Sequence, residues 1–158
     1  MIDQIVDPSE LYPKQYYSFS KGLEQLYSTK AGRKQISKIK KQFNELEREI
    51  KEYRVLGLVR DLELSREDRI ADIGCGEGEL LYLLRELGFL KAQGFEPFIE
   101  KSIHYSNGLK INKMTVEEIK DSFDYIMLNH SFEHMKNPIW ILQKLREFMD
   151  GDEARLLI

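Results

Sequence analysis

Three glycines and the acidic residue before them are the part of this sequence with the clearest chemical meaning. They are Gly74, Gly76 and Gly78, and Asp72 stands two residues before the first of them. A buried strand that runs into glycines brings its backbone close to a ligand, where a Cβ atom would collide. The helix that follows directs its free backbone N–H groups to the same place. This arrangement predicts a nucleotide-type binding site.

The glycine spacing indicates which nucleotide the site would take. A dinucleotide fingerprint has the form Gly-x-Gly-x-x-Gly, with its third glycine where helix and strand pack closely. Here that position is Glu79, so NAD or FAD fits poorly. The sequence also lacks the Gly-x-x-x-x-Gly-Lys phosphate loop.

A second acidic residue, Glu96, follows another strand-like run and lies 22 residues after Gly74. An acidic residue about 20 residues beyond the glycines can accept hydrogen bonds from ribose hydroxyls. The alternative is a solvated turn residue, because Pro97 follows directly. The loop and the spacing together favour the ribose role.

A third polar segment, Asn129 to His134, follows the strand-like run at 123–128. Ligands of an open parallel sheet bind beyond the carboxyl ends of its strands, so Asn129 and His130 should face the ligand. Asn129 and Ser131 could instead satisfy backbone groups where the strand stops. His130 is the candidate general base, whereas His134 fits a structural hydrogen bond better. The histidines form no ligand set with metal-binding spacing, so no metal is expected.

The elements that must position these residues alternate between strands and helices from residue 68 onward, which predicts a parallel sheet covered by helices. The predicted strands are 69–73, 92–95, 109–111, 123–128 and 154–158, and the predicted helices are 77–87, 98–105 and 138–149. Before them, apolar residues recur at helical spacing between 33 and 62. They are Ile36, Ile39, Phe43, Leu46, Ile50 and Tyr53. This stripe predicts a helix packed on the protein, with a coiled-coil seam as the alternative.

Composition limits the class of protein. The chain has 158 residues, 42% hydrophobic and 32% charged, which is typical of a globular domain. A net charge of −3 argues against a general nucleic-acid binder, although basic residues cluster between Lys30 and Lys41. One cysteine, no signal-peptide pattern and no apolar run of membrane-spanning length favour a cytoplasmic protein without a membrane anchor.

The pattern Asp-x-Gly-x-Gly-x-Gly resembles the cofactor loop of class I S-adenosylmethionine-dependent methyltransferases, and the segment 123–138 is similar to a later motif of that family. The resemblance implies S-adenosylmethionine as cofactor, with the glycines at its methionine end, Asp72 orienting the loop and Glu96 at the ribose. An acidic residue that often contacts the adenine is missing, which leaves Met114 and Thr115 for that place. The full set of expected cofactor-binding residues is Asp72, Gly74, Cys75, Gly76, Gly78, Glu96, Pro97, Met114, Thr115, Asn129, His130, Tyr16 and Tyr17.

Tyr16 and Tyr17 belong to a Tyr-Pro-x-x-Tyr-Tyr-Ser segment similar to one in bacterial sugar-pathway methyltransferases. They would cover the cofactor or, equally, pack the N-terminal segment on the core. The resemblance implies an α/β, Rossmann-like three-layer sandwich with a mostly parallel sheet. Residues 1–62 would form an N-terminal helical cap and residues 63–158 the core. We expect the final C-terminal strands of the family's sheet to be missing, because the chain ends at its fifth predicted strand.

The expected function is methyl transfer to a small-molecule acceptor, with a sugar-related acceptor suggested by the tyrosine segment. The alternative is a non-catalytic binding or assembly module that keeps the fold. On that alternative, a homodimer would form through the helix at 33–62. No nucleic-acid partner is expected.

Overall fold

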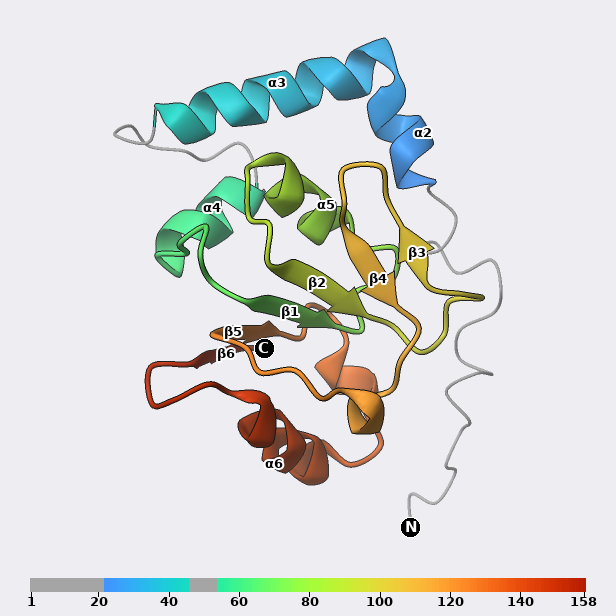
Figure 1. The fold of residues 1–158 in the computed structure, drawn as a ribbon, viewed down its shortest axis with the longest axis vertical. Helices are drawn as coiled ribbons and strands as arrows, with labels where there is room; N and C mark the ends of the chain where they lie inside the picture. Colours follow the sequence, from blue (N-terminus) through green and yellow to red (C-terminus); the bar gives the residue numbers. More distant parts are fainter. Residues whose placement is uncertain (1–21, 46–53) are drawn as a thin grey trace.

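A mostly parallel sheet runs through the centre of the protein (Figure 1), whose structure is a computed structural model that describes residues 22–45 and 54–158. The strand order is β3-β4-β2-β1-β5-β6, and among these strands β3 alone is antiparallel to its neighbour. The bounds are β1 (Ile70–Ile73), β2 (Ala92–Phe95), β3 (Ile103–His104), β4 (Lys110–Asn112), β5 (Tyr125–Met127) and β6 (Arg155–Leu157). The predicted parallel sheet is therefore confirmed, and the ends of its five predicted strands lie within two residues of those expected, whereas β3 was not predicted.

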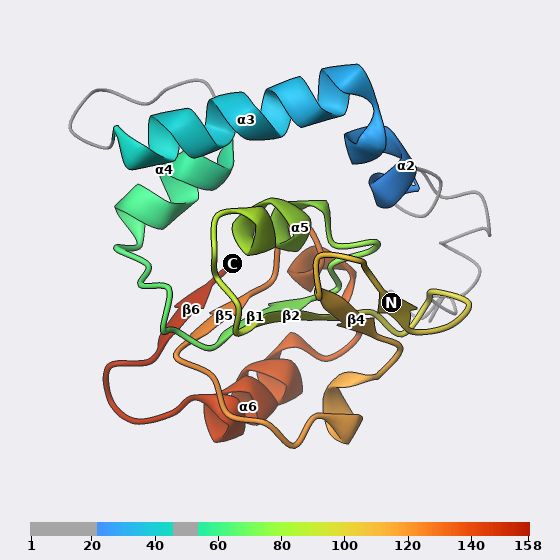
Figure 2. The ribbon, with the colours of Figure 1, turned by 45° about the horizontal axis from the view of Figure 1, so that its top comes forward.

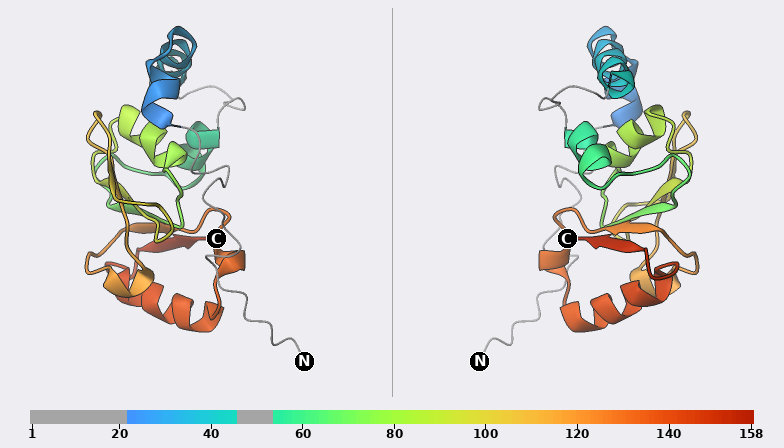
Figure 3. Two further views of the ribbon diagram at one scale, coloured as in Figure 1. Left: turned by 90° about the vertical axis from the view of Figure 1, so that its right-hand side faces the viewer. Right: turned by 90° about the vertical axis from the view of Figure 1, so that its left-hand side faces the viewer.

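Helices cover both faces of this sheet, which gives the three layers that were predicted (Figures 2 and 3). On one face lie α2 (Leu23–Ser28), α3 (Lys30–Asn44), α4 (Arg54–Asp61) and α5 (Glu79–Glu86). On the other lie α6 (Pro138–Phe148) and the short 3₁₀ helices η2 (Val116–Glu118) and η3 (Phe132–His134). None of the helices in these described ranges has the length and apolar character that crossing a bilayer would require.

Alternation along the strands separates two apolar cores, because successive strand side chains point to opposite faces. Ile70 packs with the helices α2 to α5, whereas Ala71 and Ile73 pack with α6. β5 behaves in the same way, with Met127 on the first face and Ile126 on the second. The pattern places Asp72 on the face of Ile70, toward the N-terminal helices.

The helix α3 packs against the rest of its own chain. Ile39 is buried, and Ile36 and Phe43 pack against the same core. Phe43 meets Phe89 edge to face at 6.1 Å between ring centroids. This part of the apolar stripe is therefore occupied within the chain, as the packed-helix interpretation predicted, and is not free to form a coiled-coil seam.

The expected helical range 33–62 is described as two helices, α3 and α4, which do not share an axis (Figure 1). Leu46, Ile50 and Tyr53 lie outside the described residues. Within the basic segment, Lys40 pairs with Glu86 of α5 at 2.7 Å, so one of these cations holds α3 to the core.

The helix predicted at 98–105 is wrong. That segment contains turns and the strand β3, which forms a hairpin with β4. Gly108 closes the hairpin with φ at 84°, and Tyr105 donates its backbone N–H to the Leu109 carbonyl at 2.9 Å. Glycine adopts positive φ without strain, so the chain can form a tight hairpin turn here. The pairing of Ile103 with Ile111 then adds a strand at the edge of the sheet.

Candidate active site

A cavity of about 780 Å³ lies where the glycine turn and the segments after β2, β4 and β5 meet. Such a volume is within the roughly 300–1,000 Å³ of typical ligand pockets. The cavity brings together every predicted site residue that the structure describes: Asp72, Gly74, Cys75, Gly76, Gly78, Glu96, Pro97, Met114, Thr115, Asn129 and His130. The predicted residues Tyr16 and Tyr17 lie outside the described residues.

The three glycines of the turn are required by the fold itself. Gly74, Gly76 and Gly78 have φ values of 75°, 59° and 78°, in the left-handed region that other residues rarely adopt. A Cβ at Gly74 would lie 2.4 Å from the Cβ of Ser131, and one at Gly78 would lie 2.4 Å from the Cδ1 of Ile111. The expectation that a Cβ would collide with a ligand is therefore wrong for Gly74 and Gly78, where the Cβ would collide with other side chains of the protein.

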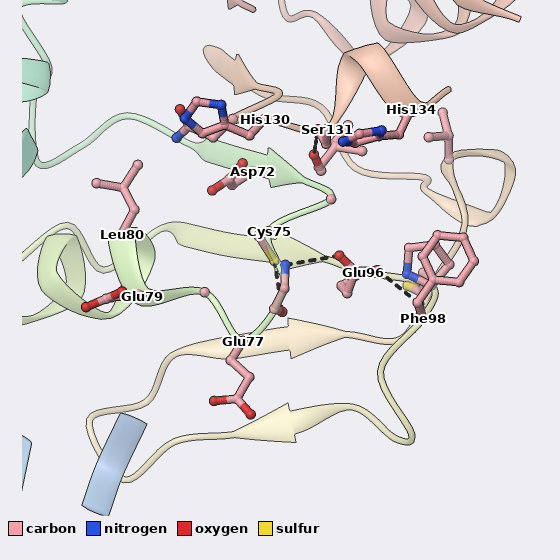
Figure 4. A pocket seen from close by; sticks show the side chains of 18 of the residues that line it. Asp72, Cys75, Glu77, Glu79, Leu80, Glu96, Phe98, His130, Ser131 and His134 are labelled. Carbon is pink, nitrogen blue, oxygen red and sulfur yellow. Dashed lines mark hydrogen bonds between the residues drawn. The ribbon is translucent and has the colours of Figure 1, made fainter. Parts of the chain in front are cut away.

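Glu96 joins the end of β2 to this turn (Figure 4). Its Oε2 accepts a hydrogen bond from the backbone N–H of Gly76 at 3.0 Å, and its Oε1 accepts one from Phe98 at 3.0 Å. Only 5% of the residue is exposed, so it is no solvated turn residue. Burial raises the pKa of Glu96, and the two backbone hydrogen bonds act in the opposite direction. Each carboxylate oxygen keeps a further lone pair that can accept another hydrogen bond.

Asp72 is a carboxylate buried near the carboxyl end of β1. The residue is 2% exposed, and its Oδ1 has no hydrogen-bond partner among the described residues. Burial raises its pKa to about 7, against which a hydrogen bond from the backbone of Asn129 and the charge of Arg54 both act. A buried polar atom without a partner is costly and is typical of functional sites. Its backbone partner is thus the segment after β5, whereas an orienting contact with the glycine loop was expected.

The segment after β5 closes the turn and presents two histidines to the cavity. Ser131 donates its hydroxyl to the carbonyl of Ile73 at 2.6 Å, so it satisfies a backbone group at a strand end, as the alternative reading proposed. His130 has φ at 54°, a conformation that is uncommon for a non-glycine residue and is often found at functional sites. His134 lies in η3, with its Nε2 3.8 Å from the carboxylate of Glu133. Figure 4 shows the two imidazoles at separate places on the rim.

The adenine-side candidates line one wall of the cavity. Thr115 and Glu118 form a capping box, in which the Thr115 side chain accepts from the Glu118 backbone N–H and the Glu118 carboxylate accepts from the Thr115 backbone N–H at 2.7 Å. The Thr115 hydroxyl also donates to this carboxylate, at 3.1 Å. Its hydroxyl proton is therefore already engaged. Met114, Phe98 and Trp140 all belong to the apolar part of the cavity lining. An apolar surface of this kind suits the face of a flat ring such as adenine.

Sequence reasoning missed the contributions of the N-terminal helices. Tyr27 of α2 donates its hydroxyl to Glu79 at 3.1 Å and stacks on Tyr82 at 5.1 Å between centroids. Arg54 of α4 donates to the Oδ1 of Asn129 at 2.5 Å. Both line the cavity, but neither belongs to a local motif, so only the packing of α2 and α4 could identify them. Among the residues that the structure covers, no cluster of His, Cys, Asp or Glu is arranged to hold a metal ion.

The strand order, the glycine turn after the central strand and the buried acid after the next strand define a class I, Rossmann-like methyltransferase fold. The chain belongs to the methyltransferase domain family, whose model matches residues 38–158. The predicted family is therefore confirmed. The match begins inside α3, and the division of the chain at residues 62 and 63 stays a prediction.

Known proteins with similar sequence or fold agree with this assignment. (S)-coclaurine N-methyltransferase of Thalictrum flavum subsp. glaucum is 30% identical over an alignment of 94 residues, which covers 52% of this chain and 26% of that protein. The chain thus spans about a quarter of this curated relative.

Two solved structures share the fold. Coclaurine N-methyltransferase bound to N-methylheliamine and SAH gives a TM-score of 0.53 at 16% identity, with 96% of this chain and 58% of that chain covered. Magnesium protoporphyrin IX methyltransferase from Synechocystis PCC 6803 with bound SAM gives 0.51 at 16%, with 94% and 74% covered. At these identities the likeness shows the fold.

Proposed function

We propose that this protein transfers a methyl group from S-adenosylmethionine to a small-molecule acceptor by in-line displacement. The chain belongs to a methyltransferase family, and magnesium protoporphyrin IX methyltransferase, which shares its fold, contains bound SAM. The observation that carries the proposal is the buried Glu96 carboxylate, held against the glycine turn at the edge of a cavity large enough for the cofactor. Two oxygens fixed in this way are suited to accept hydrogen bonds from two neighbouring ribose hydroxyls.

The remaining lining fits the other parts of the cofactor. Met114, Phe98 and Trp140 offer an apolar surface for the adenine ring. The turn from Gly74 to Gly78 and the Oδ1 of Asp72, which has no partner among the described residues, offer a polar site for the methionine end. When bound, the cofactor supplies a methyl group already activated by its sulfonium, so the protein has mainly to align the acceptor and exclude water.

His130 is the proposed general base for a hydroxyl acceptor. It lies on the cavity rim directly after Asn129, at the carboxyl end of β5. Its imidazole would take the proton that a hydroxyl loses as the new oxygen–carbon bond forms and the sulfur–methyl bond of the cofactor breaks. An acceptor that is already a nucleophile would need no such base, and His130 would then only help to position it.

The cavity wall formed by helices indicates the kind of acceptor that would fit. The lining contributed by the N-terminal helices and α5 is largely apolar, through Leu23, Val55, Leu80 and Leu83 together with Tyr27. Such a wall favours an acceptor with an apolar body. A sugar-related acceptor remains an expectation from the tyrosine segment alone, which lies outside the described residues.

We also propose a cytoplasmic location, on the sequence grounds given above. A non-catalytic assembly role has no comparable support, because the α3 residues on which it depended pack inside the chain. The same packing removes the apolar α3 residues Ile36, Ile39 and Phe43 from the surface on which a homodimer through residues 33–62 would depend.

Calorimetric titration of the chain with S-adenosylmethionine, and separately with NADH, tests the proposal. We expect saturable binding of S-adenosylmethionine and none of NADH. Binding of NADH alone, or of neither ligand, would contradict the proposed cofactor. Activity would then be sought by following S-adenosylhomocysteine formation with acceptors that carry a hydroxyl or amine on an apolar ring system.

A further inference from the structure

A row of three buried tyrosines joins the helices α2 and α5 to the β3–β4 hairpin (Figure 1). Tyr27 of α2 stacks on Tyr82 of α5, with 5.1 Å between the ring centroids and 11° between the ring planes. Tyr82 in turn meets Tyr105, which follows β3, edge to face at 5.4 Å between centroids. The row therefore brings together side chains from three elements that lie far apart in the sequence.

The two end members of this row bind the glycine turn through their hydroxyl groups. Tyr105 donates to the backbone carbonyl of Glu77 at 2.8 Å, and Tyr27 donates to the carboxylate of Glu79 at 3.1 Å. Glu77 and Glu79 stand on either side of Gly78, the last glycine of the turn, where the turn passes into α5 (Figure 4). Two tyrosines from separate elements thus hold the same three residues.

A turn rich in glycine needs contacts of this kind to keep one conformation, because glycine has more backbone freedom than any other residue. Within the turn, the backbone N–H of Gly78 donates to the carbonyl of Cys75 at 2.9 Å. The tyrosine hydroxyls add bonds from outside the turn. Burial raises the pKa of both Tyr27 and Tyr105, so both hydroxyls are protonated donors at neutral pH.

Resting on the proposed function, we propose that Tyr105 and Tyr27 are positioning residues, whose hydroxyls hold residues 77–79 in the conformation that binds the cofactor. Tyr27 lines the cavity, whereas Tyr105 is not among the described residues that line it. Tyr105 can therefore act on a bound ligand only through the turn. A turn that spends less time in the binding conformation has an apparent affinity lowered by the same factor.

The test is Tyr105→Phe, which removes one hydroxyl and keeps the ring. Hydrogen exchange of the free protein is followed at the amides of Gly76 and Gly78, which are both hydrogen-bonded in the turn. We expect exchange to become about three to ten times faster at both amides, because one hydrogen bond that closes the turn is lost. Calorimetric titration with S-adenosylhomocysteine should show an affinity lower by about three- to tenfold.

A reference amide separates this role from a general contribution to stability. The backbone N–H of Leu128 donates to the carbonyl of Leu157 at 2.9 Å, between β5 and β6 and away from the tyrosine row. Its exchange should change by less than about twofold in Tyr105→Phe. A hydroxyl that only stabilised the whole fold would change exchange at Leu128 as much as at the turn and would leave the affinity unaltered. That result would overturn the inference.

Two further variants complete the comparison. Tyr27→Phe removes the donor at the other end of the row, so exchange and affinity should change in the same direction as in Tyr105→Phe. Tyr82→Phe is the matched control, because it removes a hydroxyl that makes no hydrogen bond to another described residue. Both quantities should stay within about twofold there. Equal effects in Tyr82→Phe and Tyr105→Phe would contradict a role for the hydrogen bonds.

The two proposals can fail separately. If the unaltered protein does not bind S-adenosylhomocysteine, the proposed function is wrong. Exchange in the free protein still decides the tyrosine roles in that case, since a rise confined to the turn supports them and no rise overturns them. If the unaltered protein binds S-adenosylhomocysteine and Tyr105→Phe binds it equally well, the proposed function stands and the positioning role is wrong.

Discussion

The carboxylate of Glu96 accepts a hydrogen bond from the backbone N–H of Gly76 at 3.0 Å, and this contact ties the second strand to the glycine turn of the first. It means that the acid proposed to bind ribose also shapes the loop proposed to hold the methionine end. A substitution at Glu96 therefore tests both functions, and two different substitutions are needed to separate them.

Glu96→Ala should weaken S-adenosylmethionine binding by about 1–3 kcal/mol, because charged hydrogen bonds to the ribose are lost and backbone donors are left unsatisfied. Glu96→Gln keeps one acceptor oxygen and a similar volume, so its loss should be smaller. Calorimetric titration gives both values. Unchanged affinity in Glu96→Ala would rule out the ribose assignment.

Gly74→Ala should lower the free energy of unfolding by about 2–4 kcal/mol. The substitution adds the strain of positive φ, about 1–2 kcal/mol, and a clash with the Ser131 side chain that overpacks the turn. Urea denaturation measures the change.

The control for this substitution is Gly57→Ala. Gly57 lies inside α4, and a Cβ there meets nothing within 4 Å. Alanine favours the helix over glycine by about 0.5–1 kcal/mol, so this variant should be slightly more stable. If Gly74→Ala and Gly57→Ala lowered the free energy of unfolding by similar amounts, the predicted clash with the Ser131 side chain would be contradicted.

Stability should depend on pH through Asp72. An unfolded aspartate ionises near 3.8, whereas burial raises the folded pKa to about 7. Between these values the folded state binds more protons than the unfolded state, so the free energy of unfolding falls as pH rises and levels off above about 7.

The variant Asp72→Asn should lack this decline, because it cannot ionise. Glu96, whose pKa is also raised, is present in both proteins, and its charge is one of the causes that raise the pKa of Asp72. The difference between the urea unfolding curves therefore measures the ionisation of Asp72 together with its coupling to Glu96. A difference that stays constant from about pH 4 to about pH 8 would show that Asp72 does not have a raised pKa.

Ile39→Ala should cost about 2–4 kcal/mol of stability, because Ile39 is 2% exposed in the core beneath α3. If α3 packs within one chain, this loss is independent of protein concentration. Urea midpoints at two concentrations tenfold apart, with the mass in solution, check this. A midpoint that rises with concentration in the unaltered protein, but not in Ile39→Ala, would favour the coiled-coil seam instead.

The strands and the glycine turn could be predicted because their signals are local. A buried strand followed by glycines and a helix has one common structural solution, and the alternation from residue 68 onward fixes a parallel sheet. The helix expected at 98–105 was wrong because a short segment of mixed character can pair at a sheet edge, and that choice depends on β4 rather than on its own residues.

By itself, the sequence determined the fold class, the cofactor class and eleven residues that the structure gathers around one cavity. Asp72 lies near the carboxyl end of β1 and the other ten residues follow strand ends, and the carboxyl ends of neighbouring parallel strands lie at one edge of the sheet. Only the tertiary structure decided that Glu96 binds the turn, that Arg54 reaches Asn129, and that one oxygen of Asp72 has no hydrogen-bond partner among the described residues. The physical reason is that these relations depend on how segments far apart in the sequence lie in space. Their distances are set by the packing of helices on the sheet, which no local sequence pattern determines.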